Sequence, residues 1–282
     1  MARMQRHFFL ASLALGLSLA APALAQELRM PPPQQAHGGY TWALGLSLNN
    51  GPVYPGSASR STGVRPVIGL EIGRFTLSSG GGGSLLDFDL DARDSGLTAR
   101  LLQWEHFRLS AGLRLDGGRK AGDDPMLRGL PDIQRTLRGR LGAVYEFPGP
   151  LSLRANLSQD LLGHQGGATL QTTLRYEHQL SPSTEIGLAA GFSMADATYL
   201  RSYLGVPASA AGSSTPLPAY QPGGGMLSTE VALEIKTAIA ERWVLTGGVG
   251  YQQLRGDARR SPLAVKPDNY TVSIGLAYRC CR

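Results

Sequence analysis

Residues 107–115, FRLSAGLRL, decide the fold of this chain. Apolar side chains occupy every odd position from Phe107 to Leu115, whereas arginine, serine and glycine occupy the even positions. Successive side chains of a β-strand point to opposite faces, so this alternation predicts a strand with one apolar and one polar face. The same pattern returns in four other stretches, residues 151–157, 170–180, 227–235 and 270–278.

Strands of this kind fit a soluble β-sandwich or a membrane β-barrel. Their length of about 9–13 residues favours the barrel, because it suits a tilted membrane strand. The polar faces are also rich in charge, and the apolar faces often end in aromatic residues that suit the two membrane interfaces. These aromatic residues are Trp42, Tyr145, Phe147, Tyr176, Trp243, Tyr251, Tyr270 and Tyr278. We therefore expect an all-β protein, a closed antiparallel transmembrane barrel.

The number of strands follows from the segments and their connections. We expect twelve, near residues 40–49, 63–72, 74–90, 96–103, 106–116, 134–147, 150–161, 167–180, 184–195, 226–239, 242–255 and 270–279. The connections alternate between tight turns and longer loops, as in barrels with short periplasmic turns and long extracellular loops. Because 74–90 contains four consecutive glycines, ten or fourteen strands are the alternatives.

The N-terminal stretch precedes the barrel. A positively charged start, an apolar run at 8–21 and a small-residue site predict that residues 1–25 are a secretory signal peptide cleaved after Ala25. The Pro-rich stretch 26–39 is expected to be a flexible periplasmic lead-in, and residues 40–282 the barrel domain.

Composition excludes several function classes. A net charge of +6 is too modest to indicate a nucleic-acid partner. The two cysteines, Cys280 and Cys281, are adjacent at the C-terminus, where disulfide geometry is poor, so two free thiols are expected and intermolecular pairing is the alternative. No His/Cys/Asp cluster has the spacing of a metal site, and no motif indicates a cofactor.

An enzyme is also not expected. Asp123 and Asp124 suggest a paired-carboxylate site, but such a site needs an acid–histidine pair facing it, and His164 in another loop has no adjacent acid. His106 and His178 lie at tight-turn ends, without the nucleophilic serine that a lipase needs. Asp123 and Asp124 are therefore expected to be a solvated loop pair.

The charged residues of the polar faces are expected to share the barrel interior. Their signs nearly balance, which favours a network of ion pairs filling a narrow barrel over a polar pore with a slight anion preference. The set is Arg65, Arg108, Arg114, Arg138, Arg140, Arg154, Arg175, Glu71, Glu146, Asp160, Glu177, Glu230 and Glu234.

Several stretches resemble one family, in that family's order. They are GPVYPGS (51–57) with GVRPVIGLEIGRFTLS (63–78), DGGRKAGDDPMLRGLPDI (116–133), ATYLRSYLGV (197–206) with LPAYQPGGG (217–225), and YQQLRGDARRSPLAVKPDNYTVSIGLAYR (251–279). Over nearly all of the chain after the signal peptide, this set resembles the MipA/OmpV family (MltA-interacting protein). The family markers of the first pair are Tyr54, Pro55, Gly56, Ser57, Arg65 and Pro66. Cys280 departs from the pattern, because members tend to end on an aromatic there.

The resemblance implies an outer-membrane scaffold that links a lytic transglycosylase to a murein synthase, a penicillin-binding protein. Nothing in composition or spacing indicates this function. A small-solute channel, or an adhesin or receptor acting through loop 196–225, is the alternative. In the first loop, Pro52 and Pro55 are expected to prevent the first strand from continuing, and Tyr54 to fold the loop over the barrel mouth. The oligomeric state stays open.

Overall fold

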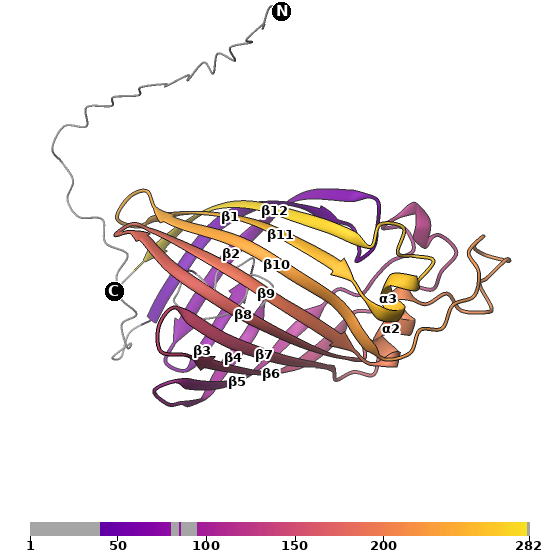
Figure 1. Ribbon diagram of the computed structural model, residues 1–282, viewed down its shortest axis with the longest axis horizontal. Helices are drawn as coiled ribbons and strands as arrows, with labels where there is room; N and C mark the ends of the chain where they lie inside the picture. The colour runs from indigo at the N-terminus through magenta and orange to yellow at the C-terminus, as the bar shows by residue number, and fades with distance from the viewer. Residues whose placement is uncertain (1–39, 80–84, 86–94, 281–282) are drawn as a thin grey trace, which may run out of the picture.

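The computed structural model describes residues 40–79, 85 and 95–280, which form twelve strands in a closed barrel (Figure 1). Every strand pairs antiparallel with its neighbours in sequence, and β12 returns to β1. The strands are β1 (Tyr40–Pro52), β2 (Arg60–Ile72), β3 (Phe75–Ser79), β4 (Gly96–Gln103), β5 (Phe107–Asp116), β6 (Thr136–Glu146), β7 (Leu151–Asp160), β8 (Ala168–Ser181), β9 (Thr184–Ala195), β10 (Gly225–Ala238), β11 (Trp243–Leu254) and β12 (Asp268–Cys280). The prediction of a twelve-stranded antiparallel barrel is confirmed.

Closure of the barrel leaves no free sheet edge between the first and last strands. The pairing of β1 with β12 runs from Trp42 opposite Cys280 to Asn50 opposite Val272. In lipid, an open edge would leave backbone groups without hydrogen bonds, so only a closed sheet can span the membrane.

The faces of the strands alternate as the sequence predicts. Leu44, Leu46 and Leu48 are each at least 46% exposed on the outer face, whereas Ala43 and Ser47, at alternate positions of the same strand, are buried toward the interior. A soluble protein would bury the leucines, so the inverted pattern marks the outer face as the lipid-facing one.

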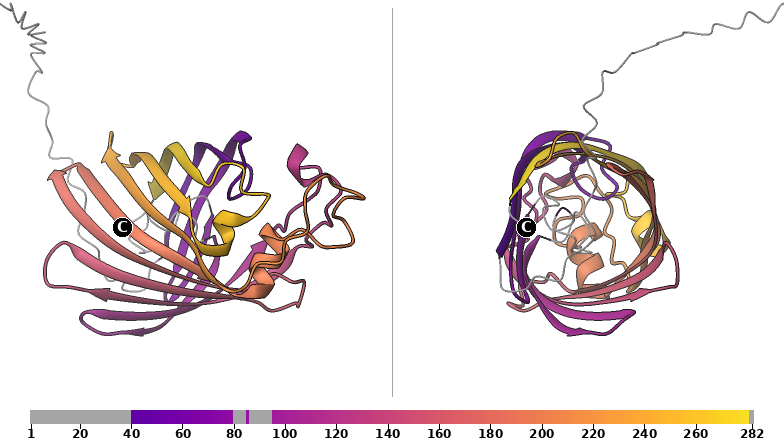
Figure 2. Two further views of the ribbon diagram at one scale, coloured as in Figure 1. Left: turned by 45° about the vertical axis from the view of Figure 1, so that its right-hand side comes forward. Right: turned by 90° about the vertical axis from the view of Figure 1, so that its left-hand side faces the viewer.

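The two ends of the barrel differ (Figure 2). Short turns lie at one end, where β1 begins and β12 ends, and they comprise residues 73–74, 104–106, 147–150, 182–183 and 239–242. Longer loops lie at the other end, with the helices η1 (Pro125–Leu127), α2 (Ala197–Leu204) and α3 (Gly256–Arg260). By the rule for such barrels, we name these the periplasmic end and the outer end.

Aromatic side chains gather at both ends. At the periplasmic end the rings of Trp42 and Trp243 lie 5.8 and 5.3 Å from that of Tyr278. At the outer end Tyr251 and Tyr270 face each other across β11 and β12, and both are exposed. The two groups mark the two membrane interfaces.

Three expectations can be compared with the structure in detail. Of the strand expected at 74–90, the structure describes Phe75–Ser79 as β3 and also Leu85, which lies inside the barrel; residues 80–84 and 86–90 lie outside the described residues. The first strand runs past its expected end at residue 49 but stops at Pro52, opposite Arg60, so the strand does not continue beyond the first of the two prolines. Cys280 forms a disulfide bond, so the expectation of a free thiol there is wrong; Cys281 lies outside the described residues.

Candidate functional site

The outer loops pack into a single body, which we call the outer cap and define as residues 53–59, 117–135, 196–224 and 255–267. Viewed along the barrel axis, α2 lies inside the outline of the barrel (Figure 2). Two groups of buried side chains hold the cap together. One comprises Tyr54, Leu127, Leu130, Val206, Ala210 and Leu263, and the other Ala195, Leu200, Leu204, Leu227, Leu254 and Ala258.

Tyr54 lies at the centre of the first group and is only 6% exposed. Its hydroxyl donates a hydrogen bond to the backbone oxygen of Leu263, 3.0 Å away and 209 residues later in the chain. Burial, together with the negative charge of Asp124, raises the pKa of Tyr54 to about 12, so the hydroxyl keeps its proton and remains a donor. The residue therefore ties the first outer loop to the last one.

Ser57 and Asp124 form a second tie, between the first and third outer loops. The Ser57 hydroxyl donates to Asp124 Oδ2 at 2.7 Å, and Asp124 Oδ1 accepts from the backbone N–H of Met126 at 2.8 Å, which caps η1. Burial alone would raise the pKa of Asp124, but these hydrogen bonds outweigh burial and hold that pKa below its usual range. Asp124 thus has a structural partner on each oxygen, which gives this carboxylate a role in folding.

The position between Pro55 and Ser57 requires a glycine, Gly56. Its φ of +94° lies in the left-handed region, and a Cβ there would come within 2.8 Å of the Ala264 Cα. Its carbonyl oxygen accepts from the backbone N–H of Lys266 at 2.9 Å. Tyr54, Gly56 and Ser57 are therefore fixed by contacts inside the cap. The last two markers lie in β2, where Arg65 shares the inner-face positions of Val67 and Glu71 and Pro66 the outer-face positions of Val64 and Ile72.

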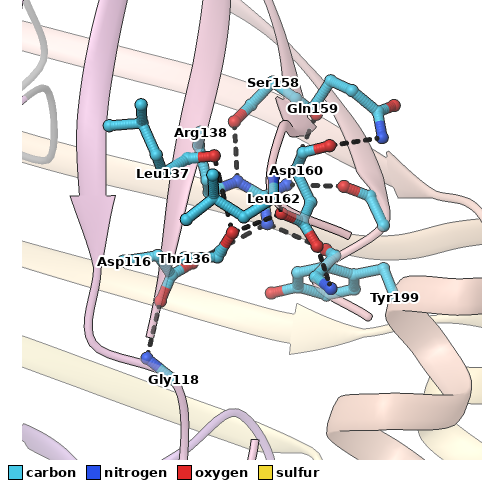
Figure 3. Close-up of polar contacts among 12 residues, drawn as sticks. Asp116, Gly118, Thr136, Leu137, Arg138, Ser158, Gln159, Asp160, Leu162 and Tyr199 are labelled. Carbon is cyan, nitrogen blue, oxygen red and sulfur yellow. Dashed lines mark hydrogen bonds and ion pairs between the residues drawn. The ribbon is translucent and has the colours of Figure 1, made fainter. Parts of the chain in front are cut away.

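Below the cap, Arg138 of β6 lies on the barrel wall beside β7 and the loop that follows it (Figure 3). Its guanidinium donates to Ser158 Oγ at 2.8 Å and to the carbonyl oxygens of Gly166 and Gly167 at 2.8 and 3.1 Å. Asp116 Oδ2 lies 3.7 Å from it. Arg138 is 4% exposed, and its guanidinium holds the loop after β7 in place.

Asp160 anchors the same loop from β7. It accepts from the Thr136 hydroxyl and from the backbone N–H groups of Leu162, Gly163 and Gly166, the last at 2.8 Å. A buried carboxylate with four donors is well compensated without an ion pair.

A row of residues crosses β8, β9 and β10 deeper in the lumen. Glu177 and Glu234 lie opposite the same residue, Gly187, from the two sides. Arg175, 5% exposed, bridges both carboxylates with N–O distances of 2.6 and 2.7 Å. A Cβ on Gly187 would lie 2.9 Å from Arg175 Nη2, so the absent side chain gives the guanidinium its space.

The remaining predicted lumen residues also lie on the inner face. Arg108 pairs with Glu146 at 2.7 Å, Glu230 accepts from the Gln171 amide at 2.6 Å, and Glu71 pairs with Arg100 at 2.9 Å. Arg154 is buried on β7, Arg114 lies opposite Arg138, and Arg140 lies opposite Gly112 and Ser158. These contacts cross-link strands that are adjacent, as β5 and β6 are, or separated by one strand, as β2 and β4 or β8 and β10 are.

Sequence reasoning missed three members of this network. They are Arg100, Glu185 and Lys236, the last two 3.4 Å apart on β9 and β10. Each lies at a polar position of an alternating strand, so the same signal that found the others was available for these three.

Leu85 adds an apolar contact inside the lumen. It is buried against Ala43, Val67, Val244 and Ala277 of the barrel wall. Beside it lies a cavity of about 80 Å³, whose lining includes both charged and glycine residues of β10 to β12. A volume of this size holds a few water molecules.

Two classes of site are not found among the residues that the structure describes. No group of three or more His, Cys, Asp or Glu side chains there is placed to hold a metal ion. Within the same residues, no helix is both long enough and apolar enough to cross a membrane.

Comparison with solved structures finds several barrels of low sequence identity. OmpT of Vibrio cholerae shares 10% identity over 88% of this chain and 100% of its own, with a TM-score of 0.37. The KdgM porin shares 9% over 84% and 98%, with a TM-score of 0.43. The COG4313 outer membrane channel from Pseudomonas putida F1 shares 12% over 88% and 98%, with a TM-score of 0.47. We draw no functional conclusion from these similarities.

Comparison with curated protein sequences finds no match. Comparison with protein families does find one, whose description is MltA-interacting protein MipA, and the match runs from residue 44 to residue 280. It covers β1 from Leu44 onward, the other eleven strands in full and the loops of the outer cap. The chain is therefore an outer-membrane β-barrel that belongs to the MipA family.

Proposed function

We propose that this barrel is a non-conducting, non-enzymatic anchor in the outer membrane that holds a lytic transglycosylase and a murein synthase together at its periplasmic end. The family description names one partner, MltA, and supports the periplasmic contact. The observation that carries the rest is the filled interior: a packed cap at the outer end and paired charges on the lumen wall below it.

The filled interior disfavours transport because a channel needs a continuous path for water. Twelve strands lie between the small barrels that enclose only side chains and the large ones that leave an aqueous channel. In this chain Tyr54 and its neighbours cover the outer end, and Arg175 with Glu234 spans three strands of the wall below. An arginine whose guanidinium is held in such a contact is not free to bind an anion that passes through the barrel.

The periplasmic turns would supply the contact with the partners. They are short, but they expose groups that a protein partner can bind. Trp104 is 64% exposed, the Glu105 side chain is 89% exposed, and Glu241 and Arg242 are exposed in the turn between β10 and β11. Aromatic and arginine side chains are enriched at protein interfaces.

Site-specific photocrosslinking in living cells tests the proposal. A photoreactive amino acid placed at Glu105 or Glu241 is expected to yield adducts with a murein hydrolase or a murein synthase, identified by mass spectrometry. The same amino acid at Ser213, exposed in the outer cap, is the matched control and is expected to give neither. Absence of both enzymes from the two periplasmic positions would contradict the scaffold.

The alternative function is a small-solute channel, favoured by the polar lumen wall and its small cavity. Single-channel recording in a planar bilayer separates the two. The scaffold predicts no steady conductance for the wild-type chain, whereas reproducible steps above the empty bilayer would establish the channel.

The proposal includes processing of the N-terminus. A periplasmic lead-in of residues 26–39 requires cleavage after Ala25, which would leave Gln26 as the first residue. Intact mass measurement of the protein extracted from outer membranes tests this directly, since retention of residues 1–25 gives a clearly larger mass.

A further inference from the structure

Arg60 lies on the outside of the barrel, although most wall arginines point inward. It is the first residue of β2, on the same face as Val64 and Ile72, which are 65% and 57% exposed to the lipid side. The side chain therefore leaves the wall at the outer end, just above the apolar band. A charge in this place faces the headgroups of the outer leaflet.

The contacts of Arg60 leave its charge uncompensated. Its guanidinium lies 3.8 Å over the ring centroid of Tyr270, and Nη1 donates to the Tyr270 carbonyl oxygen at 3.0 Å. Nε donates to the amide oxygen of Asn50 at 2.9 Å. All of these partners are neutral, and among the residues that the structure describes Arg60 has no carboxylate partner.

Lys266 brings a second positive charge to the same ring. Its Nζ lies 5.8 Å from the Tyr270 centroid, and within the described chain it has no carboxylate partner. Tyr270 is 46% exposed and belongs to the aromatic group at the outer interface. Two cations therefore flank one exposed interfacial ring.

The surrounding charges do not cancel these two. The nearest carboxylate on the same face of β12 is Asp268, which already accepts from the Tyr251 hydroxyl at 3.3 Å and lies 3.6 Å from Arg259. Arg255, exposed at the end of β11, donates to Thr229 Oγ1 and adds further positive charge to this side of the rim. The local field favours an anion.

We propose that Arg60, Lys266 and Tyr270 form a binding site for a phosphate group of an outer-leaflet glycolipid. Arginine binds phosphate through its planar fork and lysine binds it as a point charge. The position of the site selects a lipid, because apolar chains attached below the phosphate would lie against lipid-facing residues such as Val64 and Val272. A soluble anion would gain nothing from that apolar surface.

Native mass spectrometry of the folded full chain in detergent tests the site. Lipid A with two phosphates is titrated against the wild type, against Arg60→Gln/Lys266→Gln, and against the control Lys120→Gln/Arg128→Gln. The control removes the same charge from exposed positions of the outer cap. The first double variant is expected to bind at least about tenfold more weakly, because it loses two charge-assisted contacts, and the control is expected to match the wild type.

Two further measurements keep the result decisive. Dephosphorylated lipid A is expected to bind the wild type as weakly as phosphorylated lipid A binds the variant, and excess inorganic phosphate is expected not to displace the lipid. Heat-modifiable gel mobility checks the fold, and Lys266→Gln alone replaces the double variant if that variant does not fold. Equal binding by variant and wild type, equal binding of both lipids, or displacement by inorganic phosphate would each overturn the proposal.

Discussion

Replacement of Tyr54 tests whether the outer cap is one cooperative unit. Tyr54→Phe removes only the hydroxyl that donates to the Leu263 carbonyl at 3.0 Å and leaves that carbonyl without this donor. Tyr54→Ala removes the ring as well, from the middle of the apolar group that joins all four loops of the outer cap.

The two variants should differ by a predictable amount. Loss of one buried hydrogen bond costs about 1 kcal/mol, or roughly a fivefold change in the opening equilibrium of the cap. Removal of a buried aromatic ring costs about 3–5 kcal/mol, so Tyr54→Ala should raise the open fraction by roughly a hundred- to several-thousandfold. The barrel itself should stay folded, because its strands are joined by ladder hydrogen bonds that Tyr54 does not touch.

Hydrogen exchange followed by mass spectrometry measures both effects. In Tyr54→Ala, residues 255–267 and 117–135 should exchange faster, and the strand segments should keep their wild-type rates. Tyr54→Phe should show a small change in the same loops. If Tyr54→Ala accelerates exchange only within residues 53–59, the loops are independent of one another and the reasoning fails.

Three further predictions concern the cap and the lumen. Asp124 has a lowered pKa in the folded protein, so it stabilises the cap at pH values above its ordinary pKa of 3.8. This stabilisation is lost as the pH falls through the lowered pKa. Asp124→Asn should therefore open the cap to limited pepsin digestion at pH 5, where the wild type resists. Gly56→Ala places a Cβ within 2.8 Å of the Ala264 Cα at a φ of +94° and should loosen the cap by at least about 1 kcal/mol, seen as faster exchange of 255–267; an unchanged rate would contradict this. Arg175→Met leaves two glutamates unpaired and should destabilise the barrel by about 3–5 kcal/mol in urea titrations, whereas addition of Glu234→Gln should restore part of the loss.

The barrel could be predicted because its signal is local and repeated. In β5, Leu113 and Leu115 are exposed and Arg114 is not, as their alternation requires. Alternation of apolar and polar residues along a strand can be recognised without knowing which distant residues it contacts. In a membrane barrel, unlike a soluble one, the apolar face points outward. Strand ends were less certain because a proline such as Pro52 can be the last residue of a strand.

The cap could not be predicted because its contacts join residues far apart in sequence. Leu127, Val206 and Leu263 are single apolar residues in loops rich in glycine and proline, with no period to reveal that they meet. Asp124 illustrates the same limit. Its sequence context suggested a solvated loop residue. In the structure Asp124 is buried, caps η1 and accepts a hydrogen bond from the hydroxyl of Ser57, 67 residues earlier.

For the lumen network, strand alternation indicates which face a charged residue lies on but not which partner it contacts. Alternation places Arg175 and Glu234 on the inner face, but their contact depends on register across β9 and on the absence of a side chain at Gly187. Which side chains meet across strands that are not neighbours in sequence depends on the register of strand pairing. The alternation within each strand does not reveal this register.

The placement of the marker residues also bears on where a partner can bind. Tyr54 and Ser57 use their polar atoms on Leu263 and Asp124, and Gly56 is fixed by the approach of Ala264. A motif whose members are turned inward specifies how the cap folds and offers little to a ligand. A protein partner must therefore use a surface that this packing leaves free. For the murein enzymes of the proposed scaffold, which work in the periplasm, we infer that this surface is the rim of short turns.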